Sequence, residues 1–181
     1  MKIILPILAV FGLSGCASTG SNFEKLETVQ KVDLERYTGD WFEIARIDHW
    51  FQKGCVDSQA TYNLRSDGDI EVINKCRLGS SDGKVKVSKG RAWVVDPESN
   101  SKLKVQFALR FLKLPFLAGN YWIIELDEFF RYVMVGEEKR EYLWILSRER
   151  TLPDETLSML VEKAKSEGFP VDKLIYNGAL D

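Results

Sequence analysis

The residue types that support most catalytic and metal chemistry are scarce in this chain of 181 residues, which has three cysteines and one histidine, His49. A site built from several His and Cys ligands is nearly excluded by that count, so we expect neither a bound metal nor a cofactor. His49 could in principle ligate haem, but a lone histidine is more often structural or solvent-facing. No Ser–His–Asp or Cys–His arrangement is credible around the single imidazole. We therefore expect a protein that is not an enzyme.

Two carboxylate pairs, Asp127-Glu128 and Glu137-Glu138, are the remaining candidates for acid–base chemistry, but turns commonly have such charges for solubility. The overall charge excludes a further class of function. The chain has 25 basic and 27 acidic residues and a net charge of −2, whereas a nucleic-acid-binding protein needs a strong basic excess. Hydrophobic residues make up 45% of the chain, and this length and balance favour a single globular domain.

The N-terminal residues predict an export signal. A short basic start precedes an apolar run over residues 3–13, and that run is too short to cross a membrane, which takes about 20 residues. The run ends in Leu13-Ser14-Gly15-Cys16, which resembles the bacterial lipobox, where small residues precede a cysteine that is acylated before cleavage. We expect residues 1–15 to be a lipoprotein signal peptide and Cys16 to be lipidated. An ordinary signal peptide cut near this cysteine is the alternative.

The segment after the signal predicts where the protein resides. Residues 16–32 are expected to form a lipidated N-terminus and tether, and residues 33–181 the folded domain. Ala17, rather than an aspartate, follows the cysteine, and in the lipoproteins of Gram-negative bacteria that this start resembles, such a residue favours the outer membrane. The expected location is the cell outer membrane, with a lipid anchor and the folded domain facing the periplasm.

From residue 41 onward, short runs rich in Val, Ile, Phe, Tyr and Trp alternate with turn residues, a rhythm typical of an all-β sandwich or barrel. After Pro153, apolar residues recur at helical spacing and predict one amphipathic helix of about 15 residues, followed by a short strand at 174–176. Eight strands joined by short connections can close around one small ligand. The expected strands are 41–46, 58–64, 69–76, 84–95, 102–109, 120–126, 131–136 and 141–147.

Three motifs make the chain resemble the lipocalin family. Gly39-Asp40-Trp41 matches the Gly-x-Trp motif that opens the first lipocalin strand, and Arg148 follows the eighth strand. The segment that is normally Thr-Asp-Tyr is Leu126-Asp127-Glu128 here and keeps only the aspartate. The resemblance implies an all-β, eight-stranded antiparallel up-and-down barrel with one C-terminal α-helix packed outside and a short final strand. It also implies that Arg148 stacks on Trp41 at the barrel floor, a cation–π contact of about 2 kcal/mol.

Longer strings, at 44–49, 72–75 and 142–148, resemble the bacterial outer-membrane lipocalins in particular. This resemblance implies that the barrel binds fatty acids, lysophospholipids or similar amphiphiles at the cell envelope.

Alternate residues of a strand share one face, and together with the resemblance this alternation predicts which side chains face the barrel interior. On the fifth strand, Lys104 and Gln106 are expected to face solvent. No inward Lys or Arg stands out, which favours a ligand headgroup at or beyond the mouth. A solid core is the alternative for any one residue, but tyrosines and Asn74 among apolar walls favour a cavity. The predicted ligand-binding residues are Tyr62, Val72, Asn74, Trp93, Val105, Phe107, Tyr121, Ile123, Tyr132, Met134, Tyr142 and Trp144.

Two apolar loops are expected at the open end of such a barrel. The first has Trp50 and Phe51, and the second has Phe111, Leu114 and Phe116. Exposed apolar loops of this size usually contact a membrane, a ligand or a partner. A lid packed on itself and a homodimer contact are the alternatives.

Cys55 follows the first apolar loop and Cys76 ends the third predicted strand. Folding the second and third strands about Asp67-Gly68 brings their outer ends together, so a disulfide is geometrically reasonable in an oxidising compartment. Two free buried thiols are the alternative.

The leading hypothesis is a lipid-anchored carrier that binds fatty acids or lysophospholipids in its barrel and stores or transports membrane lipids in the cell envelope. Its membrane contact would be the lipidated Cys16, and we expect no nucleic-acid partner. The second hypothesis is a structural lipoprotein whose barrel is filled and whose mouth loops dock a partner protein. An enzyme is third, since isomerase-like lipocalins exist, and it would require turnover of a bound lipid.

Overall fold

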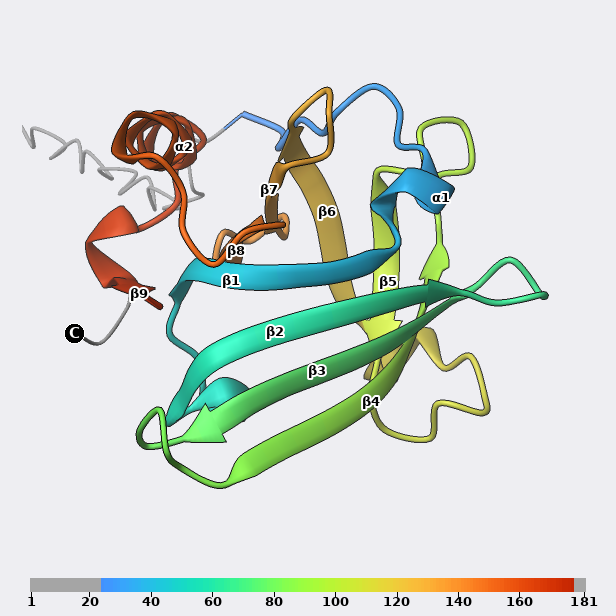
Figure 1. Ribbon diagram of the computed structural model, residues 1–181. Helices are drawn as coiled ribbons and strands as arrows, with labels where there is room; N and C mark the ends of the chain where they lie inside the picture. The colour runs from blue at the N-terminus through green and yellow to red at the C-terminus, as the bar shows by residue number, and fades with distance from the viewer. Residues whose placement is uncertain (1–23, 178–181) are drawn as a thin grey trace, which may run out of the picture.

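The fold is a closed antiparallel β-barrel of eight strands with a ninth strand bonded to its outside (Figure 1). This computed structural model describes residues 24–177. The strands are β1 (Gly39–Ile47), β2 (Cys55–Leu64), β3 (Ile70–Leu78), β4 (Val85–Val94), β5 (Lys102–Gln106), β6 (Gly119–Leu126), β7 (Tyr132–Gly136), β8 (Leu143–Ser147) and β9 (Leu174–Tyr176). Consecutive strands pair from β2 to β8, and β1 pairs with both β8 and β2, which closes the barrel. β9 pairs with the end of β1.

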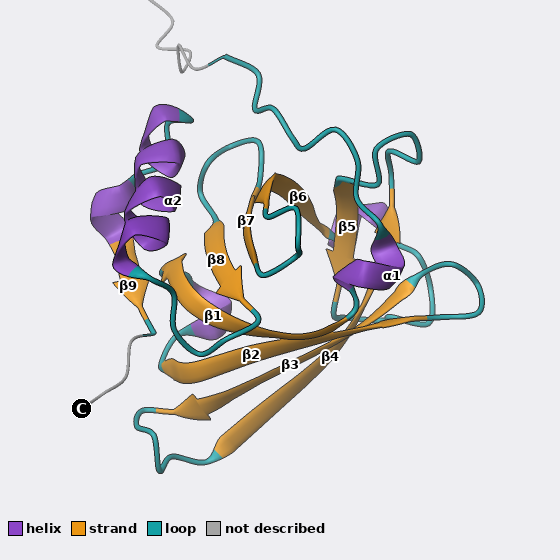
Figure 2. Ribbon diagram, turned by 45° about the horizontal axis from the view of Figure 1, so that its top comes forward, coloured by secondary structure: helices purple, strands orange, loops and turns teal. Residues whose placement is uncertain are grey.

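The main helix lies outside the barrel wall, as the sequence predicts. It is α2 (Asp154–Ser166), and it has acidic residues in its first turn and lysines in its last, where each complements the helix dipole. Figure 2 shows α2 beside β9 and a shorter helix, α1 (Leu34–Tyr37), at the other side of the barrel. Single 3-10 turns are η1 (Trp50–Gln52), η2 (Pro115–Leu117) and η3 (Val171–Lys173). Within residues 24–177, no helix is long and apolar enough to cross a membrane.

Two apolar clusters show which face of each strand points inward. The inner cluster fills the barrel interior around Trp41, toward the closed end of the barrel. It includes Trp41, Ile70, Val72, Ala92, Leu103, Ile123, Val133, Val135 and Leu146. The outer cluster joins the other face of several strands to α2 and includes Ile44, Ala45, Ile124, Met134, Leu143, Ile145, Leu160 and Ala164. The strands under α2 are therefore buried on both faces, which removes the polar–apolar alternation that a one-sided strand would show.

A β-bulge in β1 changes which of its side chains face inward. The pairing of β1 with β8 shifts register between Glu43 and Ala45. Ile44 and Ala45 both pack in the outer cluster, so alternation restarts one residue later. The bulge thereby places Glu43 and Arg46 together on the inner face, where they form a buried ion pair.

The N-terminal part of the described chain packs on the barrel, although the expected tether extended to residue 32. Leu26 is buried in the outer cluster and Val32 in the inner one. The backbone N–H of Val29 donates to the carbonyl of Ile123, and that of Val32 donates to the carbonyl of Ser99. Residues 24–32 therefore belong to the folded domain. The predicted signal peptide, Cys16 and the first part of the tether lie outside the described residues.

The fifth strand is shorter than predicted, and Gln106, which was expected in solvent, is buried on the outer face under the chain that follows the strand. β5 ends at Gln106, which is 1% exposed rather than facing solvent. Its amide nitrogen donates to the carbonyls of Ala108, Leu109 and Leu112, and its amide oxygen accepts from the N–H of Leu114. Gln106 is buried because these loop carbonyls satisfy it, and it braces the chain after β5.

Candidate ligand-binding cavity

The open end of the barrel holds a cavity of about 710 Å³, within the range of about 300–1,000 Å³ that is usual for small-molecule sites. This end, the mouth, is formed by the connections β1–β2, β3–β4, β5–β6 and β7–β8. The cavity walls come from all eight barrel strands or their connections. They are apolar and aromatic with a few hydroxyl and amide groups among them, and lysines and glutamates lie nearer the mouth. Such a lining suits a ligand that is mostly apolar.

Eight of the twelve predicted ligand-binding residues line this cavity. They are Tyr62, Val72, Asn74, Val105, Phe107, Tyr121, Tyr142 and Trp144. Alternation together with the family resemblance found these residues on or beside β2, β3, β5, β6 and β8.

The predicted orientation is wrong for three residues. Tyr132 and Met134 pack in the outer cluster with α2, while Val133 and Val135 face the interior instead. Trp93 lies between Ala92 and Val94, which both pack in the inner cluster, so its ring is on the outer face. Ile123 does face inward, but it is packed in the core below the cavity and is absent from the lining.

The floor of the barrel is sealed by the predicted stack of Arg148 on Trp41. The Arg148 guanidinium carbon lies 3.8 Å from the centre of the Trp41 ring. The guanidinium also donates to the carbonyls of Arg36, Asp40 and Phe130, at 2.8, 2.8 and 3.2 Å. One side chain therefore ties α1, β1 and the β6–β7 turn together across the closed end.

Asp127, the one residue retained from the family's second motif, organises the β6–β7 turn at the same end. Its carboxylate accepts from the backbone N–H groups of Phe129 and Arg131 and from the Arg131 guanidinium. These donors lower the pKa of Asp127, with the Arg131 hydrogen bond as the largest cause. The turn is thus held without the threonine and tyrosine of the usual motif.

Three tyrosine hydroxyls meet at the bottom of the cavity. The hydroxyl of Tyr121 is 2.8 Å from that of Tyr37 and 3.0 Å from that of Tyr62. Burial is the main cause that raises the pKa of all three phenols, so each remains protonated. The cavity therefore ends on a neutral hydrogen-bonded cluster between its apolar wall and the sealed floor.

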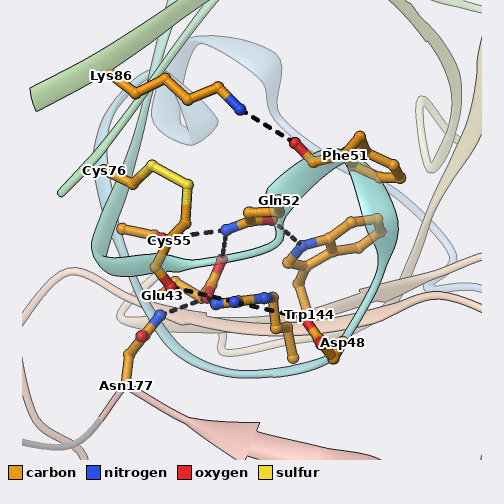
Figure 3. Close-up of a disulfide and its surroundings, with 11 residues drawn as sticks. Glu43, Asp48, Phe51, Gln52, Cys55, Cys76, Lys86, Trp144 and Asn177 are labelled. Carbon is orange, nitrogen blue, oxygen red and sulfur yellow. Dashed lines mark hydrogen bonds and ion pairs between the residues drawn. A yellow bond between two sulfur atoms is a disulfide. The ribbon is translucent and has the colours of Figure 1, made fainter. Parts of the chain in front are cut away.

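A polar network that the sequence did not reveal closes one side of the cavity (Figure 3). Glu43 accepts from Arg46 and Gln52, while Gln52 also donates to Ser58 and accepts from the indole N–H of Trp144 at 3.3 Å. Burial raises the pKa of Glu43, although the charge of Arg46 opposes that shift. Sequence alternation missed the inward Arg46 because the β1 bulge reverses the phase. Its charge is matched by Glu43, so it is not a ready partner for a ligand carboxylate.

His49 is buried beside the mouth without a hydrogen-bond partner on either ring nitrogen. Its ring stacks on Phe51 with centroids 3.7 Å apart, and the Trp144 ring lies 5.2 Å away. Burial, followed by the positive charge of Arg46, lowers the pKa of His49 to about 4. His49 is thus a neutral aromatic packing residue of the mouth.

This burial predicts a loss of stability in acid. Histidine in the unfolded chain titrates near 6.5, whereas His49 in the fold titrates near 4, so the unfolded state takes up the proton first as the pH falls. We expect this residue to remove about 1–2 kcal/mol between pH 6.5 and pH 4, less than full linkage because it borders solvent. Urea unfolding at both ends of this window should show the loss in wild type and a smaller one in His49→Phe. Equal losses in the two proteins would contradict the assignment.

The disulfide between Cys55 and Cys76 is present, as the sequence predicts, with the Cα atoms 5.4 Å apart. It joins the start of β2 to β3 directly after η1, the turn that has Trp50 and Phe51. Figure 3 shows it beside Gln52, and Lys86 donates to the carbonyl of Phe51 at 3.3 Å on the other side. The mouth turn is therefore fixed at its C-terminal end.

Removing this bond is expected to destabilise the barrel. The bond spans a sequence separation of 21 residues, and a loop of that length corresponds to a loss of about 2–4 kcal/mol in the free energy of unfolding. A Cys55→Ala, Cys76→Ala double variant should show this loss in urea unfolding. Reductant should lower the stability of wild type and leave the double variant unchanged. A reductant effect of equal size in both would rule out this bond as its source.

The five predicted mouth-loop residues lie on connections at the open end, and most of them face solvent. Trp50 and Phe51 line the cavity entrance, with Trp50 82% exposed. Phe111 and Phe116 are 71% and 80% exposed, whereas Leu114 is partly buried. The loops are thus not a lid packed on itself. Their exposed side chains are therefore free to contact a membrane, a ligand or a partner protein.

An eight-stranded barrel that is sealed at one end and holds an apolar cavity at the other defines the class of small-molecule-binding barrels. A family model described as a lipocalin-like domain matches residues 32–179. The chain belongs to the lipocalin family. It is therefore a binding protein rather than an enzyme.

Proteins of plants, bacteria and insects are similar to this chain. Temperature-induced lipocalin-1 of Arabidopsis thaliana is 41% identical over 154 residues, which cover 83% of this chain and 81% of that protein. The outer membrane lipoprotein Blc of Escherichia coli (strain K12) is 36% identical over 176 residues, covering 97% and 95%. The solved structure of insecticyanin from the tobacco hornworm Manduca sexta has a TM-score of 0.65 at 18% identity, covering 86% and 85%. It supports the fold alone.

Proposed function

We propose that this lipocalin is a membrane-anchored carrier of acyl-chain amphiphiles, binding fatty acids or lysophospholipids one at a time for storage or transport of membrane lipids in the cell envelope. The observation that supports it most is the open cavity of about 710 Å³, lined by aromatic and aliphatic side chains. A structural lipoprotein with a filled barrel, the second hypothesis, has no need of such a space.

The distribution of polarity along the cavity favours a ligand with one apolar end and one charged end. Its bottom ends on Val72 and on tyrosine hydroxyls that already bond to one another, so an acyl chain fits there without leaving a polar group unpaired. Lys75, Lys86 and Lys139 lie among the lining residues nearer to solvent. A carboxylate or phosphate headgroup at the mouth would meet these lysines.

The anchor proposal rests on the lipobox-like start and on the bacterial relatives. The outer membrane lipoproteins named Blc from Citrobacter freundii and Escherichia coli align over 97% of this chain, a span too long to leave Cys16 outside it. By analogy, Cys16 would bear the lipid, and the outer membrane would be the site of residence. Three acyl chains bind a bilayer far more firmly than one chain, whose binding is only marginal.

Titration of delipidated protein tests the carrier proposal. Trp144 lines the cavity, so oleic acid or lysophosphatidylcholine should change its fluorescence with saturation at one ligand per barrel. Because the chain has five tryptophans, the signal is assigned by comparison with Trp144→Phe, which should lose most of the change. Absence of saturable uptake for both ligands would contradict the proposed function.

A further inference from the structure

The most exposed apolar side chains of the described residues gather at the mouth of the barrel. Trp50 lies on η1 and Phe116 on η2, and these are the two large hydrophobic residues with the highest exposure there. Val85 and Val87 at the start of β4 are half exposed. We call segments 50–53, 84–87 and 107–117 together the mouth rim. A water-soluble protein rarely leaves such a surface uncovered unless it contacts something.

The charges of the mouth rim are all of one sign. The three segments contain the basic residues Lys53, Lys84, Lys86, Arg110 and Lys113 and no aspartate or glutamate. This contrasts with a chain whose net charge is −2. Lys113 pairs with Asp69 at 2.8 Å. The acidic residues of the mouth lie outside these three segments: Asp48 and Asp82 on the β1–β2 and β3–β4 connections, and Glu137, Glu138 and Glu141 on the β7–β8 turn. Exposed aromatic and basic residues together fit the interface of an anionic bilayer.

The rim is held in place rather than left to collapse into the cavity. Gln106 binds the carbonyls of the 107–112 segment, and Lys86 donates to the carbonyl of Phe51. The disulfide fixes the chain directly after η1. The apolar side chains of the rim are therefore presented to solvent by a braced backbone.

The start of the described chain lies at the same end of the barrel. Arg140, in the β7–β8 turn, donates to the carbonyl of Glu24 at 2.6 Å and to that of Glu167 at 2.7 Å. Neighbouring residues of that turn, Glu137 and Lys139, line the cavity. The eight steps from Cys16 to Glu24 span at most about 27 Å. A lipid at Cys16 would thus keep the bilayer within about 27 Å of a residue at the mouth end of the barrel.

We propose that the mouth rim docks on an anionic phospholipid bilayer, so that the cavity opens toward the membrane surface. This goes beyond the proposed carriage, because the rim would dock whether or not the cavity binds a lipid. The orientation would let an amphiphile pass between the bilayer and the cavity with little exposure of its acyl chain to water.

Vesicle sedimentation tests the docking with the lipid anchor removed. Residues 24–177 contain every strand and helix described here, so a chain that begins at Ala17 retains the barrel. It should sediment with vesicles of mixed phosphatidylglycerol and phosphatidylcholine, and less with phosphatidylcholine alone. A Phe111→Ser, Phe116→Ser double variant, which removes two exposed rim rings outside the cavity lining, should bind the mixed vesicles about tenfold more weakly or worse.

Phe129→Ser is the matched control. Phe129 is a 64% exposed aromatic residue on the β6–β7 turn at the closed end, so its loss should leave vesicle binding unchanged. The proposal is overturned if wild type does not sediment with the anionic vesicles, if it binds the neutral ones equally, or if the rim variant binds as well as wild type. Failure to bind would assign the rim to a protein partner instead.

The same preparations separate this proposal from the proposed function. Titration with oleic acid should give saturable uptake in both wild type and the rim variant, because Phe111 and Phe116 lie outside the cavity lining. Vesicle binding without oleic acid uptake would contradict the carrier and leave the docking intact. Oleic acid uptake without vesicle binding would contradict the docking and leave the carrier proposal intact.

Discussion

The Ala60→Trp variant is expected to lose ligand binding while keeping its fold. Ala60 lies on β2, pairs with Asn74 of β3, and faces the cavity. An indole there would occupy the space of about four methylene groups of an acyl chain, each worth about 0.8 kcal/mol, so the affinity for oleic acid should fall about a hundredfold. Competition for a fluorescent fatty acid measures this change.

Ile73→Trp is the control for this substitution. Ile73 lies between Val72 and Asn74, which line the cavity, so it faces the outside of the same wall. It should retain wild-type affinity. The stability of Ala60→Trp should change by less than about 1 kcal/mol, because the new ring fills space that the core does not use. Full affinity in Ala60→Trp would place the ligand outside the cavity.

The Arg148→Ala variant is expected to be the most destabilised single variant of the closed end. It loses the stack on Trp41, worth about 2 kcal/mol, and leaves three backbone carbonyls without their charged donor, so we expect a total loss of about 3–4 kcal/mol. Arg148→Lys should recover only part of this loss, because an ammonium group lacks the planar fork that reaches all three carbonyls. Urea unfolding measures both changes.

Arg150→Ala is the matched control at the same strand end. Arg150 also lies over an aromatic ring, that of Phe42, and pairs with Asp57, but its side chain is exposed. Its removal should cost less than about 0.5 kcal/mol. Similar losses in the two variants would mean that Arg148 acts as an ordinary surface charge rather than as the seal of the barrel floor.

The parts of the fold that the sequence predicted are those with a distinctive residue or a regular phase. The resemblance to lipocalins implied the pair Trp41 and Arg148, and the positions of Cys55 and Cys76 at neighbouring strand ends predicted their disulfide. Tyr142 and Trp144 were placed inward correctly because β8 continues in register to Arg148. In such cases local pattern and tertiary structure agree.

The errors come from places where a tertiary contact overrides alternation. β7 is apolar on both faces because α2 covers its outer side, so its sequence does not tell Met134 from Val135. The bulge in β1 brings Glu43 and Arg46 to one face, and no residue pattern in β1 predicts this bulge. Gln106 reads as a solvent-facing polar residue, since its partners are carbonyls of a loop that has no fixed sequence pattern.

Native mass spectrometry of freshly purified protein is the most direct test of the central claim, that the cavity holds an acyl-chain amphiphile. Wild type should retain one lipid per chain, released by mild activation, and Ala60→Trp prepared in the same way should be empty. A wild-type protein that is empty and takes up neither oleic acid nor lysophosphatidylcholine, or an adduct of equal abundance in both proteins, would contradict the account.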